Sequence, residues 1–177
     1  SEGDTVTSYL TSTVVEDDLT TFTENDSLAQ IIVCAYDPND KVAFPLGVDE
    51  LGFISDETEW IEYTIRFQNT GTDTAFNIEI IDQLDENLDW ESFSPLVSSH
   101  EMTSEIDPDG EITFTFANIM LPDSNVNVIE SQGFVKYRVD LNEDLGPGTI
   151  IENDAAIYFD LNPPIFTNTT THTLMNC

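Results

Sequence analysis

Apolar and polar side chains alternate with a period of two along most of this chain. Such alternation is typical of β-strands that bury one face. It is clearest in residues 60–68, 74–82, 111–117, 133–141 and 150–159. The apolar positions predicted to face a common core are Ile61, Tyr63, Ile65, Phe67, Phe76, Ile78, Ile80, Ile112, Phe114, Phe116, Val135, Tyr137, Val139, Leu141, Ile151, Ala155, Ile157 and Phe159.

Turn-forming segments separate these stretches: Asn-Thr-Gly at 69–71, Asp-Pro-Asp-Gly at 107–110 and Gly-Pro-Gly at 146–148. Short strands at fairly regular spacing, joined by such turns, are typical of a sandwich or a barrel. We predict an all-β fold, an immunoglobulin-like antiparallel β-sandwich of about seven strands. This sandwich is expected to span residues 37–177.

Residues 1–36 have a different pattern and predict a two-stranded N-terminal extension. Its strands are expected at Thr5–Val15 and Leu28–Ala35, joined by an acidic, threonine-rich loop. An isolated hairpin is only marginally stable in water. The simplest expectation is a linker or the tail of a preceding module. The alternatives are packing on the sandwich or the addition of strands to a sheet of another copy.

Charge is the most unusual feature of the composition: 35 acidic residues face four basic ones, for a formal net charge of -31. Nucleic acids and anionic membranes are bound through clusters of Lys and Arg, so neither is an expected partner. The longest apolar stretch, around residues 31–36, is too short to span a bilayer. An acidic surface favours solubility, and it also attracts divalent cations or basic partners.

Three polar residues are candidates for one site, and two of them fall where the alternation predicts burial. Asn153 has the parity of Ile151 and Ala155, and Asp82 continues the parity of the strand before it, while Lys41 begins the first strand of the sandwich. A buried amide costs free energy unless it is hydrogen-bonded. One hypothesis is a self-formed isopeptide bond, in which a neutral Lys41 attacks the Asn153 amide beside a protonated Asp82. The alternative is a hydrogen-bonded Asn153 next to a Lys41–Asp82 ion pair.

Acidic loops suggest structural calcium, because calcium takes six to eight oxygen ligands. The spacing is weak evidence, since Asp and Asn also form ordinary turns, and the glycine and distal Glu of an EF-hand are missing. The candidate ligands form three groups: Asp37, Asn39 and Asp40; Asp85, Asn87 and Asp89; and Asp160.

No catalytic motif is visible, and we therefore predict that the chain is not an enzyme. Its histidines, His100 and His172, belong to no triad or zinc motif, and His172, which alternates with threonines, is expected on an exposed strand. Carbohydrate binding is the alternative function. It rests on Trp60, which lies on the polar parity of its strand, and on Trp90, which follows an acidic loop.

Two cysteines, Cys34 and Cys177, flank the predicted sandwich. An oxidising compartment would allow them to form a disulfide within the chain. Free thiols and a bridge between chains are the alternatives. The first residues show no signal-peptide pattern, as expected of a mature or excised chain.

From Tyr36 to about Leu174 the sequence resembles an uncharacterised repeat module found near the C-terminus of bacterial proteins exported by type IX secretion. The motifs that carry the resemblance are YDPNDK (36–41), YTIRFQNTGTDTAFNIEIIDQLDENLDW (63–90), LPDS (121–124), GFVKYR (133–138) and AAIYFDLNPPIFTNTTTHTL (155–174). The chain departs from the usual pattern at Asn125–Gln132, and no sorting domain follows Cys177.

The resemblance implies an extracellular sandwich that acts as a stalk or spacer, without catalytic residues. It also implies O-glycans on Asp-Ser/Thr-apolar triplets, with Thr5, Ser27 and Thr74 as acceptors. Together these expectations describe a structural or adhesive module of a cell-surface protein. Its partners would be neighbouring domains or further copies, joined by β-strand addition, and surface glycans in the alternative function. Through its N-terminal strands such a module could assemble head-to-tail into a filament.

Overall fold

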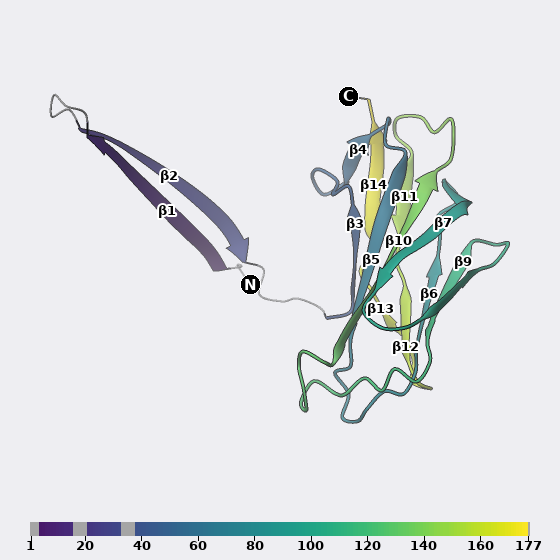
Figure 1. Ribbon diagram of the computed structural model, residues 1–177. Helices are drawn as coiled ribbons and strands as arrows, with labels where there is room; N and C mark the ends of the chain where they lie inside the picture. Colours follow the sequence, from purple (N-terminus) through teal and green to yellow (C-terminus); the bar gives the residue numbers. More distant parts are fainter. Residues whose placement is uncertain (1–3, 16–20, 33–37, 177) are drawn as a thin grey trace. The chain divides into compact units, whose positions relative to one another are not determined.

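The computed structural model describes residues 4–15, 21–32 and 38–176, and the chain divides into two compact units. Unit 1 is Ser1–Asp37 and unit 2 is Pro38–Cys177, so the division falls one residue from the boundary that the sequence pattern suggests. Each unit is built around its own β-structure (Figure 1).

Unit 1 contains one antiparallel hairpin. Strand β1 (Asp4–Val15) pairs with β2 (Thr21–Ile32) in a continuous register that runs from Asp4↔Ile32 to Val15↔Thr21. The second strand therefore begins seven positions before the predicted start at Leu28 (28 − 21), because its polar residues pair with the threonine-rich first strand rather than forming a loop.

Unit 2 is formed by three sheets, and its described residues include no helix. Their strand orders are β3-β5-β10-β7, β13-β12-β6-β9-β8 and β11-β14-β4. Most neighbours are antiparallel, and β14 and β4 pair in parallel. The strands are β3 (Asp40–Phe44), β4 (Phe53–Ser55), β5 (Trp60–Gln68), β6 (Ile78–Gln83), β7 (Leu88–Ser98), β8 (Thr103–Ile106), β9 (Glu111–Phe116), β10 (Gln132–Leu141), β11 (Ile150–Asn153), β12 (Ala156–Phe159), β13 (Ile165–Phe166) and β14 (Thr170–Met175).

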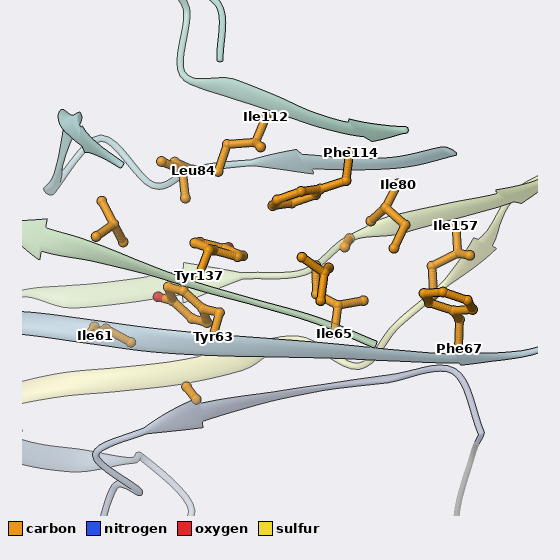
Figure 2. Packing of buried hydrophobic residues seen from close by; sticks show 14 of the residues in the cluster. Ile61, Tyr63, Ile65, Phe67, Ile80, Leu84, Ile112, Phe114, Tyr137 and Ile157 are labelled. Carbon is orange, nitrogen blue, oxygen red and sulfur yellow. The ribbon is translucent and has the colours of Figure 1, made fainter. Parts of the chain in front are cut away.

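The core of unit 2 lies between the four-stranded and the five-stranded sheet (Figure 2). Alternate residues of β5 point into it, and their neighbours on the other parity face outward. Aromatic rings bridge the sheets: Phe67 packs on Phe116 with ring centroids 5.2 Å apart, and Phe114 packs on Tyr137 at 5.5 Å. The predicted all-β, immunoglobulin-like sandwich is confirmed.

The stretch 150–159 forms two strands instead of one. Strand β11 belongs to the three-stranded sheet and β12 to the five-stranded sheet, so the chain changes sheets at Asp154 and Ala155. The alternation continues across the break, because Ile151, Asn153 and Ile157 are all buried. Parity therefore identifies the buried residues correctly even where it misses the change of sheet.

Phe76 is predicted to be buried but is 50% exposed. It lies before β6, in a segment whose backbone N–H donates to the carboxylate of Asp160. The alternation of apolar and polar residues predicts burial only within a strand, and Phe76 lies outside one. This explains why its predicted burial is wrong. Strand β7 was not predicted at all: it lies at a sheet edge, includes Pro95, and pairs with β10 through two irregularities of register. Proline and bulges are typical of edge strands and disrupt the alternation.

Replacing a central aromatic should destabilise unit 2 strongly. Phe114→Ala removes a ring that is 0% exposed and packs against Tyr137 and Phe93. We expect a loss of about 3–5 kcal/mol in the free energy of unfolding, measured by chemical denaturation. The control is Phe166→Ala, at a ring that is 65% exposed, which should change the free energy by about 0.5 kcal/mol or less. Equal losses in both variants would contradict the packing described above.

The net charge of -31 predicts that salt stabilises the fold. Raising NaCl from about 10 mM to about 1 M shortens the Debye length from about 30 Å to about 3 Å and screens the repulsion among the acids. The melting temperature, measured in EDTA so that divalent cations do not contribute, should rise. A fall would mean that the ion pairs outweigh the repulsion.

Candidate functional site: a buried lysine, aspartate and asparagine

Strand β3 holds Lys41 in place at the edge of the four-stranded sheet. On one side Lys41 lies opposite Ile65 of β5. On the other side the Asn168 side chain replaces a neighbouring strand: its Oδ1 accepts from the Lys41 backbone N–H (3.0 Å), and its Nδ2 donates to the Lys41 carbonyl (2.9 Å). The Lys41 side chain points inward and is 1% exposed. Both edges of the backbone are thus fixed, which positions the amine.

Three sheets meet at this amine. Asp82 comes from β6 of the five-stranded sheet, and Asn153 ends β11 of the three-stranded sheet. Lys41 Nζ lies 2.5 Å from Asp82 Oδ2 and 2.7 Å from Asn153 Oδ1, and it also donates to the Asp154 carbonyl at 3.3 Å. Asp82 and Asn153 are 0% and 2% exposed. The three polar residues that the sequence analysis names therefore form one cluster inside unit 2.

Tyr137 of β10 completes the cluster. Its hydroxyl donates to Asp82 Oδ2 (2.6 Å) and accepts from Asn153 Nδ2 (3.3 Å). The Tyr63 ring centroid lies 4.7 Å from Lys41 Nζ, which covers the amine from the β5 side. The sequence pattern placed both tyrosines in the core without giving them a role. The sequence could have indicated such a role, because a tyrosine at a buried position usually needs a hydrogen-bond partner for its hydroxyl.

Burial governs the electrostatics of this cluster. Desolvation lowers the pKa of Lys41, and the charge of Asp82 opposes that change. Desolvation also raises the pKa of Tyr137, with a further contribution from the Asp82 charge, so the phenol stays protonated and able to donate. Asp82 Oδ1 is buried and has no hydrogen-bond partner among the described residues. One carboxyl oxygen thus holds two hydrogen bonds and the other holds none.

This cluster is closed to solvent. A substrate cannot reach side chains that are 2% exposed or less, so any chemistry here takes place among the members of the cluster. The arrangement places a primary amine next to an amide carbonyl, with an acid that contacts the amine. An unreacted cluster is also a hydrogen-bonded polar network, although Asp82 Oδ1 and the hydroxyl of the neighbouring Tyr63 have no partner among the described residues.

The remaining cations all lie nearer the surface and are paired with acids. Their contacts are Arg66 Nε with Asp40 Oδ1 at 2.7 Å and Arg66 Nη2 with Asp40 Oδ2 at 2.5 Å, Lys136 with Glu62, and Arg138 Nε with Asp140 Oδ1 at 3.7 Å. Together with Lys41, these are the four basic residues of the whole chain. No basic patch is therefore left to neutralise phosphates.

Most of the candidate calcium ligands accept hydrogen bonds from backbone N–H groups. Asp85 accepts from the backbone N–H groups of Asn87 (2.9 Å) and Glu152 (3.0 Å). Further caps of this kind are Asp160 on residues 76 and 77, Asp89 on Glu91, and Asn39 on Gln68. Asp40 instead pairs with Arg66, and Asp37 lies outside the described residues.

In the described part of the chain, no group of three or more His, Cys, Asp or Glu side chains is arranged to hold a metal ion. The calcium hypothesis therefore gains no support from unit 2.

Both tryptophans are half-buried, and both rings make contacts within unit 2. Arg138 Cζ lies 4.1 Å from the centroid of the Trp60 ring, which also packs near Phe44. Trp90 donates from Nε1 to the Asp85 carbonyl (3.0 Å) and lies against the backbone of Gly110. A Cβ added at Gly110, whose φ is 81°, would come within 2.5 Å of that ring. Both rings therefore cover their own loops and strands.

The predicted disulfide and two of the predicted glycan acceptors cannot be assigned. Cys34 and Cys177 lie outside the described residues. Thr5 and Ser27 lie in β1 and β2, of which the structure describes the backbone. Thr74 is half-buried, and its backbone N–H donates to the Asp73 carboxylate at 2.8 Å. These assignments remain predictions.

The prediction that His172 is exposed is wrong: it is 2% exposed. Its Nε2 lies 3.0 Å from the Pro45 carbonyl, which can only accept, so Nε2 carries the proton. Nδ1 is buried without a partner among the described residues. His172 alternates with threonines, as expected of a strand, but this face of β14 packs inward next to Leu174. His100 is half-buried beside Ser99, and its Nδ1 lies 2.8 Å from the Ser99 hydroxyl oxygen.

Family comparison assigns most of the chain. Residues 37–173 match the model of a family described as a domain of unknown function, DUF7619. The match covers more than half of the chain, and the chain belongs to this family. No curated protein matches the sequence.

Among solved structures, the chain is similar in fold to proteins described as bacterial adhesins and pilins. The major pilin subunit BcpA of Bacillus cereus matches with a TM-score of 0.50 and 13% identity, over 94% of this chain and 48% of the pilin. The collagen-binding domain of RspB from Erysipelothrix rhusiopathiae matches with a TM-score of 0.49 and 10% identity, over 97% of this chain and 57% of that one. A collagen-binding domain of a Staphylococcus aureus adhesin matches with a TM-score of 0.46 and 12% identity, over 80% and 99%. At such identities the likeness concerns the fold.

None of the described residues belongs to a helix that could cross a membrane.

The burial of His172 predicts a pH-dependent stability. Burial lowers the pKa of His172, although its hydrogen bond to the Pro45 carbonyl opposes the change. The unfolded chain then binds more protons than the folded chain below a pH of about 6.5, so this contribution is complete above that pH and is lost as the pH falls. The slope is at most about 1.4 kcal/mol per pH unit for one proton.

The measurement compares the unfolding free energies of the wild type and His172→Gln between about pH 8 and about pH 5.5. This range brackets the ordinary pKa of histidine. The stability of the wild type should fall relative to the variant toward low pH. The titration of the acids is common to both proteins and cancels in the difference. A difference that does not depend on pH would contradict the burial of a neutral His172.

Proposed function

We propose that this member of the DUF7619 family is a non-enzymatic, extracellular structural or adhesive module of a bacterial surface protein. Its N-terminal hairpin joins it to a neighbouring module or to another copy of itself. The resemblance to modules of type IX-secreted proteins supports the extracellular setting. The fold shared with a protein named as a major pilin subunit supports a role in a surface structure.

The observation that carries the proposal is the two-stranded sheet of unit 1, whose strands β1 and β2 pair with no further described strand. Each is 12 residues long, and their register has no bulge. Neither strand contains Lys or Pro. Native proteins use such residues and bulges to prevent edge pairing, so this hairpin has the features of a strand-pairing segment.

The edges of unit 2 contrast with this hairpin. Strand β7 has Pro95 and irregular pairing, and the outer edge of β3 is occupied at Lys41 by the side chain of Asn168. These edges of unit 2 are therefore protected from further strand pairing. A two-stranded sheet, by contrast, is only marginally stable by itself. Strand addition to another sheet gives the hairpin the third strand that it needs.

The sealed polar cluster supports a role without turnover. Lys41, Asp82 and Asn153 are the residues of unit 2 in which an amine, a carboxyl and an amide come together, and they are closed to solvent. Carbohydrate binding remains the alternative from the sequence. No contact of Trp60 or Trp90 favours it, because both rings are engaged within unit 2.

Deletion of the hairpin should abolish self-association. We expect the molar mass of the full chain, measured by light scattering under reducing conditions, to rise with concentration, because strand pairing in a head-to-tail manner is open-ended. A chain lacking residues 1–33 should stay monomeric over the same range.

Reduction removes any bridge through the cysteines, so the difference reports strand pairing alone. A full chain that stays monomeric at every concentration would contradict self-assembly. The hairpin would then serve a different partner, the neighbouring module of the same protein.

A further inference from the structure

Unit 2 buries a complete set of groups for one covalent reaction, which goes beyond the proposed function and does not depend on it. We propose that Lys41 and Asn153 form an intramolecular isopeptide bond, promoted by Asp82, with the release of ammonia. The proposal rests on the contacts of the Lys41 amine, the isolation of the cluster from water, and the chain of hydrogen bonds that leads to the Asn153 amide nitrogen.

The first requirement is a neutral amine, because an ammonium has no lone pair. Lys41 and Asp82 have side chains that are both 0% exposed, in contact at 2.5 Å. Separated charges are costly in such a place, and transfer of one proton from Lys41 to Asp82 makes both groups neutral. The amine contacts Asp82 Oδ2 directly, so the proton passes along this hydrogen bond.

The second requirement is an electrophile held against the amine. Lys41 Nζ lies 2.7 Å from Asn153 Oδ1, which places it beside the carbonyl of that amide. The amide cannot turn away: its Oδ1 faces Lys41, and its Nδ2 faces the Tyr137 hydroxyl. Holding two groups together in a reactive orientation can be equivalent to a reactant concentration of about 10⁵–10⁸ M. The reaction of an unactivated amide is slow, but the folded protein keeps the two groups in contact while it proceeds.

The third requirement is a proton for the leaving group. Asp82 Oδ2 accepts from Tyr137, and Tyr137 accepts from Asn153 Nδ2. These bonds connect the attacking nitrogen to the leaving nitrogen: Lys41, Asp82, Tyr137, Asn153. Tyr137 is a positioning residue that also relays the proton, and its raised pKa keeps it in the donating form.

The reaction balances without a further reactant. The lone pair of the Lys41 amine forms a bond to Asn153 Cγ, and the carbonyl electron pair moves to Oδ1. When the pair returns, the bond from Cγ to Nδ2 breaks. A proton lost by Nζ passes through Asp82 and Tyr137 to Nδ2, which leaves as ammonia. A secondary amide between Nζ and Cγ remains, and Asp82 is regenerated once ammonia is protonated in water.

The product would join strands that are far apart in the sequence. Residues 41 and 153 are 112 positions apart, and they belong to β3 of the four-stranded sheet and β11 of the three-stranded sheet. The bond would close the chain between the first strand and one of the last strands of unit 2. A module that transmits force along its length would then keep its core when pulled at both ends.

Intact mass of the wild-type chain tests the proposal directly. The protein is purified folded, then denatured and reduced so that disulfides do not contribute. We expect a mass lower than the sequence mass by one ammonia. A mass equal to that of the sequence overturns the proposal, whatever the behaviour of the variants.

Digestion locates the bond. The chain has two lysines, Lys41 and Lys136. A lysine-specific protease should cut after Lys136 but not after Lys41, and a branched peptide should contain both Lys41 and Asn153. A succinimide at Asn153 would give the same mass deficit but would leave Lys41 cleavable. That result overturns the proposal.

Variants with matched controls test the roles of the residues. Lys41→Met and Asp82→Asn should both show their full sequence masses, the first for lack of a nucleophile and the second for lack of a proton acceptor. The controls, Lys136→Met and Asp140→Asn, change a lysine and an aspartate of exposed ion pairs and should keep the deficit. A deficit that persists in soluble, folded Asp82→Asn overturns the role of Asp82, and one that persists in Lys41→Met overturns the bond.

Discussion

The contact between Lys41 and Asp82 is the constraint on which the interior of unit 2 depends. An amine and a carboxyl lie among apolar side chains, where a lone charge would be very costly. Neither group can be removed alone without leaving the other unpaired. The contact also determines which strands must be present, because the two residues come from different sheets. The sandwich is therefore complete only when β3 and β6 are both in place.

This constraint explains several features that are otherwise unrelated. Asn168 uses its whole amide to hold the backbone of Lys41, so the edge strand that carries the amine cannot shift its register. The hydroxyl of Tyr137 donates a hydrogen bond within the cluster, and its ring packs with Phe114 and Phe93 in the apolar core. One residue thus links the polar cluster to the aromatic packing between the sheets. A change in either region is expected to affect the other.

The alternation pattern was sufficient for the fold and for the members of the cluster, because burial in a strand depends on parity alone. It identified Asp82 and Asn153 as inward-facing, even though the second lies at a break between strands. It was insufficient where other forces act. Phe76 lies in a loop, β7 is an irregular edge strand, and the inward face of β14 at His172 depends on its neighbours in space. The calcium hypothesis stays a prediction, since backbone caps and calcium ligands use the same residue types.

Charge and burial have opposite distributions in this molecule. The outside carries nearly all of a net charge of -31, whose self-repulsion favours expansion. The inside holds a dry aromatic core and one amine that contacts an acid. Surface ion pairs cannot balance the repulsion, since the three that exist outside the core contribute little each. Resistance to expansion must therefore come from the interior, and the place where three sheets meet is where a single tie, ionic or covalent, holds the most strands together.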